Sequence, residues 1–186
     1  MHYSSAFLVS LLAATAAAKG FVLPANQEDG VYISKGRPHP HSSKFRRDVS
    51  TTVKIGNITY DEVTEPGAIE KRGVPWTAVR CDDRNILNEW DYAPARDNLK
   101  KSCDKGNKAP AWDGKSGILY ARVGSAIWYV CSWGGENPCS TDEINDAEVK
   151  MDAECTDEVS AWIEVSNWKK GYGRAISGME VCDQRP

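Results

Sequence analysis

The six cysteines constrain this 186-residue chain most, because all of them lie after residue 80. They are Cys81, Cys103, Cys131, Cys139, Cys155 and Cys182. An even number of cysteines in a small exported domain is typical of disulfides rather than of a metal site. Three bridges are therefore expected, and the spacing alone leaves about fifteen pairings open.

The first 18 residues indicate export. An apolar run from Ala6 to Ala18 ends in Ala16-Ala17-Ala18, and small residues of this kind precede signal-peptidase cleavage sites. The run is too short to cross a bilayer core of roughly 30 Å as a permanent helix. We expect cleavage after Ala18, secretion to the extracellular space and no stable membrane insertion.

A dibasic pair, Lys71-Arg72, separates two parts of different composition. All three histidines precede it, whereas all seven tryptophans and all six cysteines follow it. Residues 19–72 are polar and contain few large apolar side chains, so little in them offsets the entropy of ordering. The composition predicts a signal peptide over residues 1–18, a largely disordered propeptide over 19–72 and a mature cysteine-rich domain over 73–186.

Two further motifs lie in the predicted propeptide. Arg46-Arg47 is a second dibasic pair, and the sequence leaves open whether it is also cut. Asn57-Ile58-Thr59 is an N-glycosylation sequon, which predicts a glycan on Asn57. The leader and the pair Lys71-Arg72 together resemble fungal secreted precursors that a kexin-type protease cuts after Lys-Arg.

The mature part predicts alternating strands and helices. Residues 76–81 favour a strand, and a helix is expected between Asp83 and Cys103 with Asp91 as its N-cap. A hairpin is expected around Gly124-Ser125, and Ser140 with Glu143 predicts a capping box before a helix from Thr141 to Cys155. Strands over 160–165 and 176–182 complete the order βαββαβ. We therefore expect an α+β sandwich, in which two helices cover one face of an antiparallel sheet.

This layout resembles the small secreted killer-toxin-like proteins of fungi. The resemblance is carried by the element order, by the block Cys-Ser-Trp-Gly-Gly-Glu-Asn-Pro-Cys-Ser over residues 131–140, and by a Gly-containing last strand that ends in Cys182. The group includes viral killer toxins of smuts and necrosis-inducing effectors. The resemblance implies a secreted fungal protein that acts on another organism or on a competing cell.

Residues 73–186 offer little catalytic chemistry. They contain no histidine, which removes histidine triads and most zinc sites, and oxidised cysteines are neither nucleophiles nor zinc ligands. The carboxylate pairs Asp82-Asp83 and Asp157-Glu158 could serve a glycosidase, but such pairs are frequent in an acidic domain. We predict no catalytic residue, no metal and no cofactor.

Charge and aromatic content favour a protein-binding role. Residues 73–186 carry 14 Lys and Arg against 19 Asp and Glu, which disfavours nucleic acid as a partner. Residues 168–174 combine cations with aromatics in an expected loop, although a solvated turn would have the same composition. Trp76, Trp128 and Trp162 are instead expected in the core. The candidate target-binding residues are Trp133, Trp168, Lys169, Lys170, Tyr172 and Arg174.

The leading hypothesis is a secreted effector or toxin-like protein, monomeric, that binds a host or competitor protein and promotes virulence or cell death. Uptake into host cells stays open. One alternative is an antifungal killer-type toxin. Another is a secreted carbohydrate-active enzyme or inhibitor that uses a carboxylate pair or an aromatic platform.

Overall fold

A computed structural model describes residues 21–35, 51–60, 73–110, 117–156 and 158–182. The predicted signal cleavage at Ala18 and the predicted processing pair Lys71-Arg72 lie outside the described residues. Seven strands form the main sheet: β2 (Gly30–Lys35), β3 (Thr51–Gly56), β4 (Ala78–Ile86), β6 (Gly117–Val123), β7 (Ala126–Ser132), β9 (Val159–Val165) and β10 (Lys170–Ile176).

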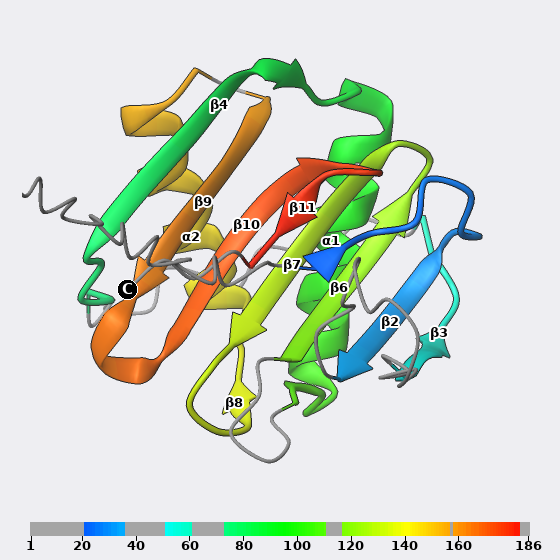
Figure 1. The fold of residues 1–186 in the computed structure, drawn as a ribbon, viewed down its shortest axis with the longest axis horizontal. Coiled ribbons are helices and arrows are strands. Elements are labelled where there is room, and N and C mark those ends of the chain that lie inside the picture. Colours follow the sequence, from blue (N-terminus) through cyan, green and yellow to red (C-terminus); the bar gives the residue numbers. More distant parts are fainter. Residues whose placement is uncertain (1–20, 36–50, 61–72, 111–116, 157, 183–186) are drawn as a thin grey trace, which may run out of the picture.

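The main sheet is antiparallel throughout, with the strand order β3-β2-β6-β7-β10-β9-β4 (Figure 1). Two two-stranded sheets accompany it. One pairs β1 (Phe21–Val22) with β11 (Glu180–Val181), and the other pairs β5 (Lys108–Ala109) with β8 (Asn137–Pro138). The helices are α1 (Glu89–Asp104), α2 (Thr141–Glu154) and the short 3-10 helix η1 (Ser166–Trp168).

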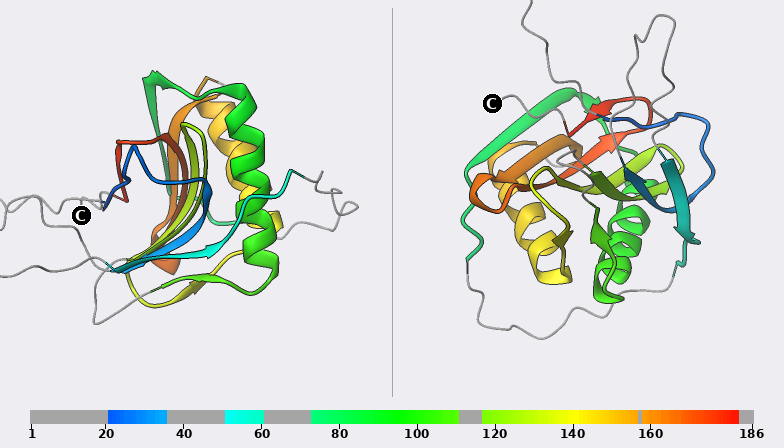
Figure 2. Two further views of the ribbon diagram at one scale, coloured as in Figure 1. Left: turned by 90° about the vertical axis from the view of Figure 1, so that its right-hand side faces the viewer. Right: turned by 60° about the horizontal axis from the view of Figure 1, so that its bottom comes forward.

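The prediction of an α+β protein with an antiparallel sheet and two helices is confirmed. The order βαββαβ is not the order of the whole chain, because β1, β2 and β3 precede β4 and because short strands follow α1, β7 and β10. In the two views of Figure 2, α1 and α2 lie on the same side of the main sheet. We call this side the helix side and the opposite side the open side.

The prediction that residues 19–72 are largely disordered is wrong for residues 21–35 and 51–60. Strand β2 pairs with β6 along six residues, and β3 pairs with β2. Residues Val31 and Tyr32 of β2 are each only 5% exposed. The few apolar residues of this segment suffice because β6 supplies a ready-made edge, so ordering them needs no separate core.

The predicted hairpin and the second predicted helix are confirmed. Strands β6 and β7 pair from Gly117↔Ser132 to Val123↔Ala126 around Gly124-Ser125. Ser140 caps α2 by accepting a hydrogen bond from the backbone N–H of Glu143 at 3.2 Å. The apolar stripe of α2, which consists of Ile144, Ala147 and Met151, is fully buried.

The predicted N-cap of the first helix is wrong. Helix α1 begins after Asn88, whose side chain accepts a hydrogen bond from the N–H of Trp90 at 2.9 Å. Asp91 instead accepts hydrogen bonds from the backbone N–H and the hydroxyl of Ser125, at 2.8 and 3.0 Å. Asp91 therefore fastens α1 to the turn of the β6–β7 hairpin. This contact is distant in sequence, so local spacing does not predict it.

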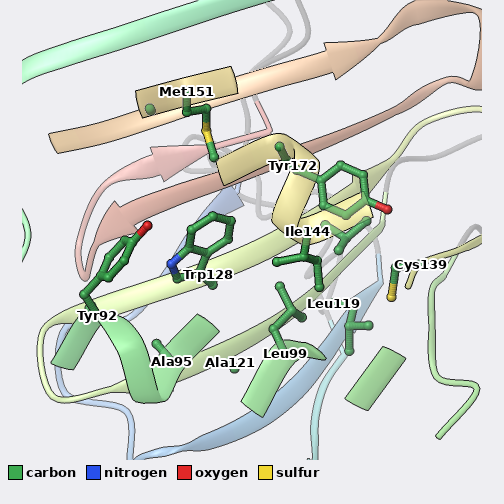
Figure 3. Close-up of a cluster of buried hydrophobic side chains, with 14 of the residues drawn as sticks. Tyr92, Ala95, Leu99, Leu119, Ala121, Trp128, Cys139, Ile144, Met151 and Tyr172 are labelled. Atoms are coloured by element: carbon green, nitrogen blue, oxygen red, sulfur yellow. The ribbon is translucent and has the colours of Figure 1, made fainter. Parts of the chain in front are cut away.

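The main core lies between the sheet and the helices. Figure 3 shows Leu99 of α1 and Ile144 of α2 pointing at side chains of the sheet, with Trp128 of β7 among them. Trp128 is fully buried, as predicted. A second buried cluster covers part of the open side and contains Phe21, Leu23, Tyr32, Ile118, Tyr120, Ile127, Tyr129, Cys131, Ala175, Val181 and Cys182.

Three disulfides are formed, as predicted. Cys81–Cys155 joins β4 to the end of α2, Cys103–Cys139 joins the end of α1 to the start of α2, and Cys131–Cys182 joins β7 to the residue after β11. No described cysteine is free. Each bridge thus ties a helix end or a short strand to an element distant in sequence.

Candidate functional site

The prediction that residues 168–174 form a surface loop is wrong. Only η1 and Lys169 form a turn there, and β10 begins at Lys170 in the interior of the sheet, between β7 and β9. Strand alternation turns Lys170, Tyr172 and Arg174 towards the helix side, where they are 2%, 0% and 1% exposed. These three candidates therefore cannot contact a target directly.

Lys170 and Tyr172 share one carboxylate of α2. The ammonium of Lys170 lies 2.5 Å from Oε2 of Glu143 and donates to the carbonyl of Pro138, and the Tyr172 hydroxyl donates to the same Oε2. Burial lowers the pKa of Lys170, and the Glu143 charge opposes that shift. Glu143 was expected to complete the capping box, but its carboxylate is used here because a buried ammonium needs a counter-charge.

Arg174 is the start of a second polar chain. Its Nη1 donates to Asp152 at 2.5 Å and to the Tyr92 hydroxyl at 3.0 Å. The Tyr92 hydroxyl donates to Glu148 at 2.7 Å, and Arg96 donates to the same carboxylate oxygen at 2.8 Å. Burial and the Glu148 charge raise the pKa of Tyr92, so the phenol keeps its proton as a donor. The acidic side chains of α2 are thus partly used to pair cations of the sheet and of α1.

The other three candidates gather at one end of the sheet. Trp168 is 42% exposed, and Lys169 is exposed at a positive φ of 52°. The Trp133 backbone N–H donates to the Lys169 carbonyl at 3.0 Å. The side chain of Lys169 lies over Gly134, where a Cβ would overlap it. We call Trp133, Trp168 and Lys169 the sheet-end cluster.

A row of aromatic rings crosses the open side from this end. The Trp133 ring lies 6.1 Å from that of Trp162, which in turn stacks on Tyr129 at 6.2 Å and an interplanar angle of 17°. The row crosses β10 at Gly171 and Gly173, where added Cβ atoms would overlap Trp162 and Tyr129. Glycine on this side of β10 is therefore what lets two rings lie flat on the sheet.

A cavity of about 260 Å³ adjoins this aromatic row. Trp162 and Tyr129 line it together with Arg80 and Asp82 of the edge strand β4 and with residues 179–182. A hydrogen bond from the Asn85 side chain at 2.7 Å lowers the pKa of Asp82, which therefore stays ionised. The cavity combines an aromatic wall with charged residues of both signs, Arg80 and Arg174 against Asp82 and Glu180. This combination suits a polar ligand or a protein side chain.

The open-side residues Arg80, Tyr129 and Trp162 were not predicted as a site, and Trp162 was assigned to the core. Trp162 and Trp76 are both partly buried. The alternation Gly171-x-Gly173 in a strand was the available signal, because glycine in a strand interior often marks close approach of another group. The predicted glycan acceptor Asn57 is exposed just after β3, and its modification stays a prediction.

Within the described residues, no group of three or more His, Cys, Asp or Glu side chains could hold a metal ion. Over the same residues, no helix has the length and apolar content of a membrane span. A scan of family models, a search of curated proteins and a search of solved structures found no match to this chain. The killer-toxin-like resemblance therefore stays a prediction.

Proposed function

We propose that this chain is a secreted fungal effector or toxin-like protein that binds a host or competitor protein through its open side. The observation that carries the proposal is that the aromatic row runs from Trp133 to Trp162 and Tyr129, and that the last two of these rings also line the cavity. Exposed tryptophan beside charged side chains is the composition of binding hot spots. The leader and Lys71-Arg72 support secretion and processing of the precursor.

The resemblance to killer-toxin-like proteins is part of the proposal. We infer that residues 73–182 form a βαββαβ unit, in which β4, α1, β6, β7, α2 and the pair β9–β10 are its successive elements. The two-residue strands β1, β5, β8 and β11 and the two strands β2 and β3 are additions to that unit. The three disulfides support an extracellular place of action, because such bridges persist in oxidising compartments.

The purified secreted protein is tested on plant leaves and on cultures of related fungi. Cell death in leaves supports an effector, and growth inhibition supports a killer-type toxin. The variants Trp133→Ala and Trp162→Ala are expected to lose most of the effect. Trp90→Ala is the matched control, because Trp90 is 84% exposed on α1. Inactive wild-type protein in both assays, or fully active open-side variants, would contradict the proposal.

The aromatic row also favours a second candidate function, which is carbohydrate recognition. Sugar rings stack on flat aromatic faces, and Trp162 offers such a face beside Asp82 and Arg80. The test is a pull-down on insoluble polysaccharides, followed by an assay for released sugars. Binding that Trp162→Ala abolishes would favour a carbohydrate ligand, and sugar release that Asp82→Asn abolishes would show an enzyme.

A further inference from the structure

The upstream strands are integral to the fold, although the predicted processing site separates them from the cysteine-rich part. We call residues 21–35 and 51–60 the upstream unit, and residues 73–182 the downstream part. We infer that the upstream unit is a non-covalently held subunit, which stays bound to the downstream part after the chain is cut between them. This inference goes beyond the proposed binding function and does not depend on any target.

The first contact is at the edge of the main sheet. Strand β2 pairs with β6 from Gly30↔Arg122 to Lys35↔Gly117. The Tyr32 ring stacks on Tyr120 at 5.2 Å. All seven residues of β6 are buried. Loss of β2 would uncover this buried strand and leave its backbone groups free to pair with other chains.

The second contact covers the open side. Phe21 and Leu23 are each 2% exposed and belong to the buried cluster there. Strand β1 pairs with β11, and the Leu23 carbonyl accepts a hydrogen bond from the N–H of Gly178 at 2.8 Å. Because the Cys131–Cys182 bridge fastens the end of this β11 segment to β7, β1 docks on a surface that is already tied to the sheet.

The third contact is on the helix side. The Thr59 backbone N–H donates to the Asn98 side-chain oxygen at 2.9 Å, and the Asn98 amide donates back to the Thr59 carbonyl at 2.7 Å. Lys101 donates to the Thr59 hydroxyl at 2.9 Å. In Figure 2 the blue segment lies on the open side and the cyan segment reaches the helix side. The upstream unit therefore reaches both sides of the sheet.

No cysteine precedes Cys81, so no disulfide links the upstream unit to the downstream part. Retention after a cut must come from strand pairing and from buried side chains. Processing at Lys71-Arg72 would then produce a two-chain protein. The predicted mature domain of residues 73–186 alone would lack one sheet edge and part of the open-side cluster.

The test uses the full chain with a site-specific protease recognition sequence in place of Lys71-Arg72. The folded protein is cut and passed over a size-exclusion column without denaturant, and each peak is identified by its intact mass. Both chains are expected in one peak at micromolar concentration, and they should separate in denaturant. Elution of the downstream chain without its partner would overturn the inference, whether that chain is folded or aggregated.

A matched pair of variants tests which contact holds the upstream unit on the downstream part. Phe21→Ser combined with Leu23→Ser removes the two buried anchors, whereas Val22→Ser changes the side chain between them, which is 50% exposed. The double variant is expected to bind at least about 100-fold more weakly after the cut, judged by dilution, because two large apolar side chains are involved. Equal retention of the two variants would show that the open-side contact does not hold the unit. Circular dichroism of the uncut variants checks their folding.

Discussion

Each side of the main sheet contains a buried arginine, and the two arginines differ in their hydrogen-bond and ion-pair partners. Arg174 on the helix side is 1% exposed and lies 2.5 Å from the Asp152 carboxylate. Arg122 on the open side is 7% exposed, and its Nη2 donates to the Ala25 carbonyl at 2.9 Å. Its Nε and Nη1 have no hydrogen-bond partner within the described part of the chain.

The difference follows from what covers each side. Helix α2 brings Glu143, Glu148 and Asp152 against the sheet and its neighbours, so cations can be buried there with counter-charges. The open side is covered by aromatic rings and by the backbone of residues 21–29, which supply carbonyls but few charges. The helix side is thus specified by ion pairs, whereas the open side is specified by aromatic packing.

The largest expected effect comes from breaking the helix-side pairing. Arg174→Met should lower the free energy of unfolding by about 3 kcal/mol or more, because it leaves a partly buried carboxylate and a buried phenol without their donor. Denaturant unfolding measures the loss. Arg84→Met is the control, since its pair with Asp82 at 3.3 Å involves a side chain that is 90% exposed. Equal losses for the two variants would show that burial of the pair is unimportant.

A pH titration of stability tests the open side through the buried phenol of Tyr120. Burial raises the pKa of Tyr120 to about 12. A raised pKa stabilises the folded chain below the ordinary pKa near 10, and the stabilisation is lost as the pH rises towards 12. Tyr120→Phe should therefore reduce the alkaline loss of stability by on the order of 2 kcal/mol. An unchanged alkaline unfolding curve would contradict this expectation.

The aromatic row depends on the glycines of β10, because Gly171 and Gly173 leave room for the rings. Gly171→Ala should cost about 1 to 2 kcal/mol and change the tryptophan fluorescence, because the added Cβ displaces the Trp162 ring. Gly56→Ala in β3 is the matched control, since its nearest neighbour would lie at an ordinary 3.6 Å. A neutral Gly171→Ala with unchanged fluorescence would mean that the ring does not need the glycine.

The smallest expected effect has the opposite sign. Arg122→Met should raise the free energy of unfolding by about 1 kcal/mol, because it removes a buried cation whose Nε and Nη1 have no partner among the described residues. Thermal unfolding at neutral pH measures the change beside Arg174→Met. A loss of stability in both variants would remove the contrast between the two sides.

Several parts of the fold were predictable from local pattern. The hairpin at Gly124-Ser125, the cap at Ser140 and the apolar stripe of α2 depend on residues close in sequence, and all three are confirmed. Three bridges followed from an even number of cysteines in a chain for which export is expected. Their pairing did not, because it depends on which elements the sheet brings together.

The candidate site was harder to predict. Residues 168–174 look like a surface loop because they are rich in charge, and a strand interior normally excludes charge. Only the carboxylates of α2, some 20 to 30 residues away in sequence, make burial of Lys170 and Arg174 acceptable. Strands β2 and β3 were missed for a related reason, since β2 is stabilised by an edge that β6 supplies.

By itself, the sequence determined the α+β class, the three disulfides and the contrast between a cysteine-free leader and a cysteine-rich remainder. The tertiary structure decided which polar residues are buried, which rings face solvent and where the upstream strands belong. The physical reason is that hydrogen bonding within turns and caps is local. Burial of a charge or of an unpaired strand edge is decided by partners that only folding brings within a few ångströms.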